Sequence, residues 1–221
     1  MTFSIVGYCP DTGAFGIAIT SSSVAVASRC AWTKAGSGVI ATQNLTNPHL
    51  GPLGLDLLSR GLSETIVRDM LVASDAGRDH RQLMVLGPSG RCAHFTGASA
   101  LDIHAHASDL NCGAAGNLLS DKSIPERMVF AFCKGADRPF AQRLLDGLHA
   151  GLAAGGEIRP LQSAGLLVAD NSGWTSIDLR VDLHEAPLDE LQRLWDVYRP
   201  LHVGYVDRVL APERYFVPPK E

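Results

Sequence analysis

The chain opens with Met1-Thr2-Phe3-Ser4-Ile5-Val6-Gly7-Tyr8 (MTFSIVGY), and its apolar, β-branched character predicts a strand that starts almost at once. The segment Pro10-Asp11-Thr12-Gly13 follows as a turn, because proline presets φ and glycine permits positive φ. Residues 15–22 form a second predicted strand, so the chain begins with a β-hairpin. Thr2 therefore either begins an edge strand without further consequence or takes part in the chemistry of the protein.

The rest of the chain alternates predicted strand pairs with pairs of amphipathic helices. A strand over 38–42 precedes helices over 51–60 and 63–73, and Ser63 stands in the N-cap position of the latter. Further strands are predicted over 81–86, 91–95, 162–169 and 174–181, and further helices over 121–134, 139–153 and 187–198. Hairpins dominate over βαβ crossovers, so residues 1–221 are expected to form one α+β domain whose helices cover antiparallel sheets.

Composition and charge exclude several classes of function. The 221 residues are 46% hydrophobic and 19% charged with a net charge of −4, as expected of a soluble globular protein with a substantial core. No basic run exceeds a pair of residues, so we expect no nucleic-acid partner. No apolar run reaches the ~18 residues of a membrane span, and no leader is evident, so we expect a cytoplasmic protein without membrane contact.

The ligating side chains give no complete metal site. The five cysteines are widely spaced without a CxxC pair, which favours small buried apolar residues over disulfides or zinc ligands. His104 and His106 would share one face of a strand, with Asp102 and Asp109 nearby, an arrangement that suits zinc. A third ligand is not specified, so we expect neither metal nor cofactor, and a metallohydrolase on these histidines is one alternative.

A second polar cluster lies near the end of the chain. Asp178, Arg180, Asp182 and His184 alternate with apolar residues and would share one face of a strand. This pattern is typical of a salt-bridged surface and is also compatible with substrate binding.

Thr2 differs from these candidates because processing can change its chemistry. Threonine is small enough for removal of Met1, which would leave a free α-amine on the residue that carries the hydroxyl. A hydroxyl is a weak nucleophile unless a base accepts its proton, and an α-amine has a pKa of ~7.7–8.0, near working pH. One residue could then be both nucleophile and base.

Several stretches together resemble an uncharacterised bacterial and archaeal family known as domain of unknown function 1028. The matching stretches are residues 1–32 and 34–63, DAGRDHRQ at 75–82, HFTG at 94–97, GNLL at 116–119, QSA at 162–164 and DLRVDLHEAPLDEL at 178–191. Each is short, but their order along almost the whole chain is specific. The resemblance implies an N-terminal-nucleophile (Ntn) hydrolase-like fold: a four-layer αββα sandwich in which two antiparallel sheets lie between helical layers.

The resemblance also implies roles for individual residues. Thr2 would be the nucleophile at the start of the first strand. Gln43 and Asn44, where a strand leaves for a helix, and Asn117, in a predicted Gly-Asn loop, are candidate oxyanion donors, since a neutral amide can hold developing charge. Lys34 lies roughly where proteasome-like chains keep a lysine that tunes the amine.

The expected function is cleavage of a C–N bond in an amide, lactam or ureido group of a small molecule. The alternative is a non-catalytic ligand-binding or scaffold protein on the same fold. A homo-oligomer is expected in either case, and the identity of the ligand is left open. The candidate substrate contacts are Ser22, Asn47, His94, Gln162, Asp178 and Arg180.

Overall fold

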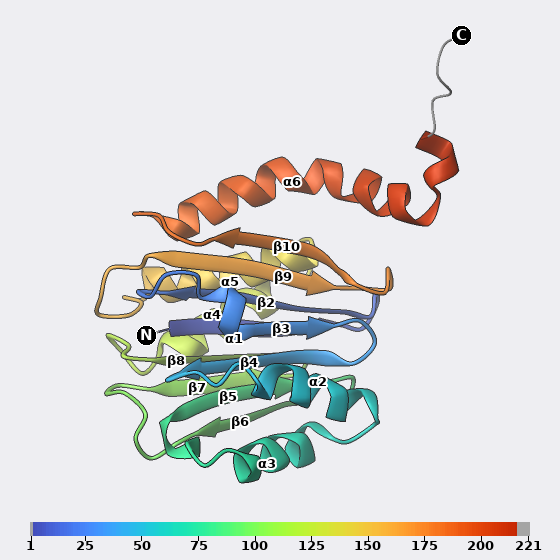
Figure 1. The fold of residues 1–221 in the computed structure, drawn as a ribbon. Helices are drawn as coiled ribbons and strands as arrows, with labels where there is room; N and C mark the ends of the chain where they lie inside the picture. Colours follow the sequence, from blue (N-terminus) through green and yellow to red (C-terminus); the bar gives the residue numbers. More distant parts are fainter. Residues whose placement is uncertain (1, 216–221) are drawn as a thin grey trace.

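The computed structural model describes residues 2–215, which form two antiparallel β-sheets and six α-helices (Figure 1). One sheet has six strands in the order β10-β9-β2-β1-β8-β7, and the other has four in the order β3-β4-β5-β6. This architecture confirms the predicted combination of helices with antiparallel sheets.

The strands are β1 (Thr2–Cys9), β2 (Ala14–Ser21), β3 (Ala31–Lys34), β4 (Gly38–Asn44), β5 (Arg81–Leu86), β6 (Cys92–Thr96), β7 (Ala105–Asp109), β8 (Cys112–Asn117), β9 (Ser163–Ala169) and β10 (Thr175–Val181). The helices are α1 (Ala27–Cys30), α2 (Leu50–Ser59), α3 (Glu64–Ser74), α4 (Ile124–Lys134), α5 (Phe140–Ala153) and α6 (Pro187–Leu210).

The first strand lies in the middle of the larger sheet. β1 pairs with β2 on one side and with β8 on the other, and both of its faces are buried. Phe3 and Ile5 belong to the core beneath the helices, whereas Val6 belongs to the core between the sheets. Burial on both faces explains the continuous apolar run of the opening sequence. Thr2 therefore begins a central strand, and the edge-strand interpretation is wrong.

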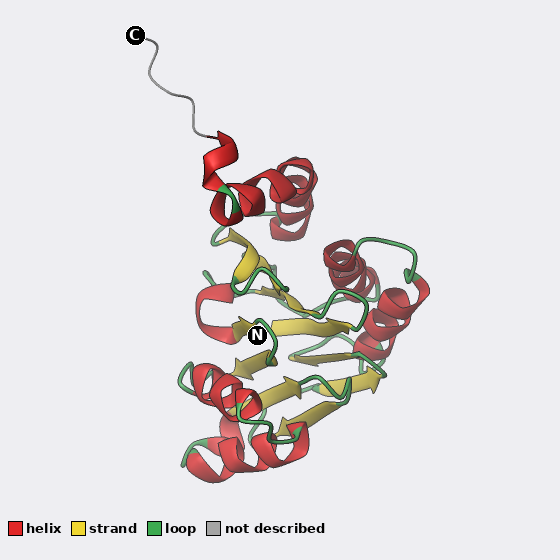
Figure 2. Cartoon of the chain, turned by 90° about the vertical axis from the view of Figure 1, so that its right-hand side faces the viewer, coloured by secondary structure: helices red, strands yellow, loops and turns green. Residues whose placement is uncertain are grey.

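The two sheets pack face to face, and helices lie on their outer faces (Figure 2). Between the sheets, Ile17 and Ile19 of β2 belong to the same buried cluster as Val39 and Ala41 of β4. Helices α4 and α5 contact the six-stranded sheet, and α2 and α3 contact the four-stranded sheet. The amphipathic helices predicted from spacing thus bury one side each against a sheet.

Local sequence features explain how these elements join. Gly13 has φ 69° in the turn between β1 and β2, a left-handed conformation that glycine adopts without steric cost. Ser63 caps α3 by accepting a hydrogen bond from the backbone of Ile66 at 3.5 Å, as predicted. Gly51 lets α2 approach the ring of Trp32, because a Cβ at this position would collide with the indole.

Three parts of the chain differ from the sequence prediction. The short elements α1 and β3 and the strand β8 were not predicted, and Asn117 ends β8 rather than lying in a loop. The sequence suggested a strand that holds both His104 and His106, but β7 begins at Ala105 and leaves His104 outside it. The sequence of β8, CGAAGN, has little intrinsic strand preference, and pairing with β1 and β7 outweighs it. Helix α6 runs on to Leu210 through Pro200, although the sequence suggested an end near Tyr198.

No helix in the described part of the chain combines the length and apolar character of a membrane span.

Two leucines on helices test this arrangement. Leu144 of α5 is fully buried against the six-stranded sheet, whereas Leu210 of α6 is 63% exposed. We expect Leu144→Ala to lower the free energy of unfolding by about 2–5 kcal/mol, because it leaves a cavity. Leu210→Ala should change it by no more than about 0.5 kcal/mol. Urea unfolding followed by circular dichroism measures both, and equal losses would contradict the packing described.

Candidate active site

Thr2 is buried where the central strand begins. Only 3% of its surface is exposed, and its Oγ1 donates a hydrogen bond to Ser21 Oγ at 3.3 Å. Ser21 lies opposite Thr2 on β2, and Asn117 lies opposite it on β8. Side chains of directly paired residues point to the same face of a sheet, about 4.5–5.5 Å apart at Cβ. Thr2 is thus flanked by a hydroxyl on one side and a carboxamide on the other.

A buried network of amides joins the two sheets next to Thr2. Ser4 Oγ donates to Gln43 Oε1 at 2.7 Å, and Gln43 Nε2 donates to Gln82 Oε1 at 2.7 Å. Asn117 Nδ2 also donates to Gln82 Oε1, at 3.1 Å. Gln82 Nε2 in turn donates to the backbone oxygen of Gly116 at 3.0 Å. All four side chains are buried, so Gln82 is the hub of an internal polar cluster.

Two of the predicted oxyanion donors belong to this network. A carboxamide carries two N–H donors, and each of Gln43 and Asn117 uses one of them on Gln82. In the part of the chain that the structure describes, Asn117 Oδ1 has no hydrogen-bond partner although it is buried. Asn117 directly faces Thr2, whereas Gln43 contacts Ser4 two residues further along β1. Asn117 is therefore the nearer donor to the Thr2 hydroxyl.

Glu157 is a buried carboxylate at the same end of the sheet, and sequence reasoning missed it. Its Oε2 accepts a hydrogen bond from the backbone of Ser22 at 3.1 Å. Ser22, a predicted substrate contact, follows Ser21, the partner of Thr2 on β2. Burial raises the pKa of the Glu157 carboxyl, and the hydrogen bond from Ser22 opposes that rise. The lone glutamate after two glycines carries no recognisable motif. Gln82 was also missed, although it ends one of the family-matching stretches.

Asn44 and Asn47 hold backbone rather than facing Thr2. Asn44 has φ 70°, and its Nδ2 donates to the carbonyl of His80 at 2.6 Å while its Oδ1 accepts from the backbone of Leu101 at 3.2 Å. Asn47 Oδ1 accepts from the backbone of His49 at 3.2 Å at the start of α2. The two asparagines therefore fix the connection between β4 and α2.

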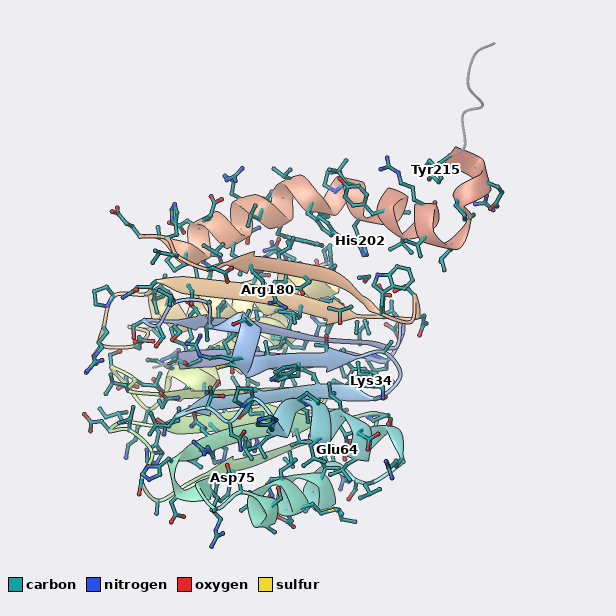
Figure 3. All side chains as sticks on the ribbon, viewed as in Figure 1. Lys34, Glu64, Asp75, Arg180, His202 and Tyr215 are labelled. Atoms are coloured by element: carbon teal, nitrogen blue, oxygen red, sulfur yellow. The ribbon has the colours of Figure 1, made fainter. Side chains whose placement is uncertain are left out.

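Three other predicted residues lie away from Thr2. Lys34 is exposed and pairs with Gly38. Gly38 precedes Gln43 by five positions along β4, about 17 Å at the rise of a strand. In Figure 3 Lys34 lies at the end of the sheets opposite to the start of β1. Asp178 and Arg180 form an exposed ion pair at 2.7 Å on the edge strand β10, three strands from β1. The structure therefore does not bring these residues to Thr2.

The histidines gather at the other edge of the sheets. The ring of His94 on β6 stacks on that of His106 on β7, with centroids 4.4 Å apart. Burial lowers the pKa of His94 to about 4, and the neighbouring His106 and Arg68 add to this effect. His104 is exposed, and its Nδ1 lies 2.9 Å from the carbonyl oxygen of Asp102. Within residues 2–215 no three His, Cys, Asp or Glu side chains are arranged to hold a metal ion, so no third ligand joins this pair.

An open cleft borders the Thr2 end of the sheet. It encloses about 690 Å³ between the segments 160–162 and 183–185. Gln162 lines it, and the backbone N–H of Gln162 donates to the carbonyl of Ser21 at 2.8 Å. His184 lines the same cleft, and its backbone N–H donates to the carbonyl of Gln162 at 2.8 Å. Gln162 thus connects this cleft with the residue that faces Thr2.

Fold and site together define a protein of two face-to-face antiparallel sheets with a buried polar site at the start of its central strand. Over residues 2–191 the chain matches the family of unknown function DUF1028, and it belongs to that family. The crystal structure of a Silicibacter pomeroyi protein of the same family is similar, with a TM-score of 0.82 and 31% identity over 89% of this chain and 88% of that one.

A second solved structure is less similar. The ancestral β-subunit Anbu from Yersinia bercovieri aligns over 99% of this chain and all of its own, at 12% identity and a TM-score of only 0.40. No curated protein matches the sequence.

Removing the hub of the amide network should destabilise the fold. Gln82→Leu leaves Gln43 Nε2, Asn117 Nδ2 and the Gly116 carbonyl without their buried partner. We expect the free energy of unfolding to fall by at least about 2 kcal/mol, because buried unpaired polar groups are costly. The same change at exposed Gln162 should alter it by no more than about 0.5 kcal/mol. Similar denaturation midpoints for the two variants would contradict the network.

His94 should make stability sensitive to acid. Its pKa is about 4 in the folded protein and 6.5 in an ordinary environment, so the unfolded chain binds its proton first as the pH falls. The free energy of unfolding should therefore decrease from about pH 6.5 towards pH 4, and His94→Gln should remove part of that decrease. Chemical denaturation across this range measures the slope. His104→Gln, at an exposed position, is the control, and parallel curves for wild type and His94→Gln would refute the assignment.

Proposed function

We propose that the protein is an Ntn-type hydrolase that cleaves a C–N bond of a small molecule after Met1 has been removed. The observation that carries this proposal is the position of Thr2 at the start of a central strand, with the carboxamide of Asn117 directly opposite. Two antiparallel sheets with helices on both outer faces also agree with the αββα sandwich of that class. Membership of DUF1028 is neutral, because the family has no stated activity.

In the first step, Thr2 Oγ1 attacks the carbonyl carbon of an amide, lactam or ureido group. Its proton passes to the α-amine of the same residue, which acts as the base in its neutral form. The second N–H of Asn117 stabilises the oxyanion that forms, with Gln43 as a more remote donor. The C–N bond then breaks, and the leaving nitrogen takes the proton from the α-ammonium group.

In the second step, water releases the acyl group. The neutral α-amine accepts a proton from the attacking water, which adds to the ester carbon on Thr2 Oγ1. Collapse of this intermediate returns the proton to Oγ1 and frees the acid. Lys34, Asp178 and Arg180 have no part in this scheme, because they lie away from Thr2.

The burial of Thr2 favours a small reacting group. Thr2, Ser21 and Asn117 are all buried, so a substrate must reach Thr2 Oγ1 with a compact part of its structure. The open cleft beside Gln162 is wide enough for the remainder of a small molecule. The predicted homo-oligomer and cytoplasmic location stay predictions.

The same cleft supports the second candidate, a ligand-binding protein without catalysis. It is lined by Gln162, His184 and Glu185, whereas Thr2 is not part of its lining. A ligand held there would contact a wall of mixed polar and apolar groups without reaching the hydroxyl. The state of the N-terminus separates the two candidates, because only the hydrolase needs a free α-amine.

The N-terminus and Thr2 provide the test. We expect intact-mass analysis of the native protein to show loss of one methionine, and a β-lactone probe to acylate Thr2 Oγ1, as located by peptide mass spectrometry. Thr2→Ala should lower probe acylation and hydrolysis of small amides by at least about 10³-fold without unfolding the protein. Thr2→Ser, which keeps the hydroxyl, is the matched control. A folded native protein that retains Met1, or undiminished hydrolysis by Thr2→Ala, would refute the proposal.

A further inference from the structure

The buried carboxylate of Glu157 spans the end of the sheet where β1 begins. On one side its Oε2 accepts a hydrogen bond from the backbone of Ser22, the residue after the partner of Thr2 on β2. On the other side its backbone forms a β-bridge with Leu119, two residues beyond the partner of Thr2 on β8. Both neighbours of β1 thus run past Thr2, and Glu157 connects their continuations.

One oxygen of this carboxylate has no donor in the described chain. Glu157 is 7% exposed, and its Oε1 is buried without a hydrogen-bond partner among residues 2–215. The comparable buried glutamate, Glu64 of α3, is better satisfied, because its Oε1 accepts from Ser89 Oγ at 2.8 Å and from the Ser89 backbone at 3.3 Å. A buried carboxylate oxygen without a donor is costly, so Glu157 is suited to bind a further N–H group.

We propose that Glu157 is the positioning residue for the α-amine of Thr2, which its Oε1 binds once Met1 is removed. This inference rests on the processing step of the proposed function. An N–H held by Oε1 would restrict rotation about the N–Cα bond of Thr2 and direct the rest of the amine towards Oγ1. The neutral amine can donate the same N–H, so its orientation survives loss of a proton.

The surroundings of Glu157 agree with a cationic partner. Burial raises the pKa of the carboxyl, and the hydrogen bond from Ser22, the charge of the N-terminal amine and the charge of Arg159 offset only part of this rise. An ammonium group would supply both a donor and the opposite charge. An ion pair between this ammonium group and the Glu157 carboxylate would raise the pKa of the amine and lower the pKa of the acid.

The test measures the α-amine directly in the full chain from Thr2 to Glu221. A cleavable leader that ends immediately before Thr2 provides the free amine whatever happens to Met1 in cells. With ¹⁵N-labelled threonine, the nitrogen signal of the N-terminal residue is titrated against pH. We expect the wild-type amine to titrate about one unit or more above the ordinary ~7.7–8.0. Glu157→Gln should lower that pKa by about one unit, a tenfold change in the protonation equilibrium.

Two matched variants define the result. Glu64→Gln removes the other buried glutamate, which lies on α3 (Figure 3), and should leave the amine pKa unchanged. Glu157→Asp keeps the negative charge on a side chain that is one methylene shorter, and should give an amine pKa between those of wild type and Glu157→Gln. An ordinary pKa in the wild type, or equal values in wild type and Glu157→Gln, would overturn the inference. The wild-type titration decides even if Glu157→Gln fails to fold.

The outcome is separable from that of the proposed function. If the native protein retains Met1 or resists the β-lactone probe, the hydrolase proposal fails, yet a Glu157-dependent amine pKa in the leader-cleaved chain still supports the pairing. If Thr2 is acylated and hydrolysis occurs, but the amine pKa is the same in wild type and Glu157→Gln, the hydrolase proposal is supported and the positioning role of Glu157 is wrong.

Discussion

The hydrogen bond from Ser4 to Gln43 joins the two sheets at the end where the chain starts, and the geometry of the site depends on it. Aliphatic side chains such as Val6, Ile17 and Val39 pack between the sheets, and their hydrophobic contacts have no directional preference. The 2.7 Å bond between Ser4 and Gln43 is directional and buried. Because Ser4 is only two residues from Thr2, this bond fixes where the first residue of β1 lies relative to β4.

The amides of Gln82 and Asn117 extend this hydrogen-bonded link between β1 and β4 to the strands β5 and β8. Gln82 on β5 receives hydrogen bonds from Gln43 and Asn117, so Asn117, which faces Thr2, is held from the opposite sheet. A fully paired polar network in a low-dielectric interior specifies one arrangement of its members, whereas an apolar core tolerates several. Glu157 and Asn117 break this rule, since each keeps one buried oxygen unpaired in the described chain. Asn117 faces Thr2, and Glu157 accepts a hydrogen bond from the residue after the partner of Thr2 on β2, so both oxygens belong to the end of the sheet where β1 begins.

The sequence was informative wherever local chemistry decides structure. The Pro-Asp-Thr-Gly turn, the Ser63 cap and the helices on either side of residue 135 follow from neighbours in the chain. Strand β8 did not follow, because its alanines and glycines gain strand structure only by pairing with β1 and β7. The position of Thr2 in the family pattern pointed to the correct end of the sheet. Gln82 and Glu157 could not be found in this way, because their contacts lie 35 and 135 residues away. Lys34 was wrongly expected near Thr2, because its approximate spacing along the chain was taken as a guide. In the structure Lys34 pairs with Gly38, at the far end of β4.

Helix α6 divides into a supported half and a projecting half. Leu188, Leu191 and Trp195 are buried against the sheet, and the Tyr198 hydroxyl donates to the carbonyl of Ser176 at 2.8 Å. Beyond that contact Pro200 lacks the N–H that would close the helical turn before it, and the helix extends past the body of the protein (Figure 1). Stability is therefore graded along one continuous element. Its first turns open only with the sheet, whereas its last turns can unwind and re-form while the remainder of the molecule stays intact.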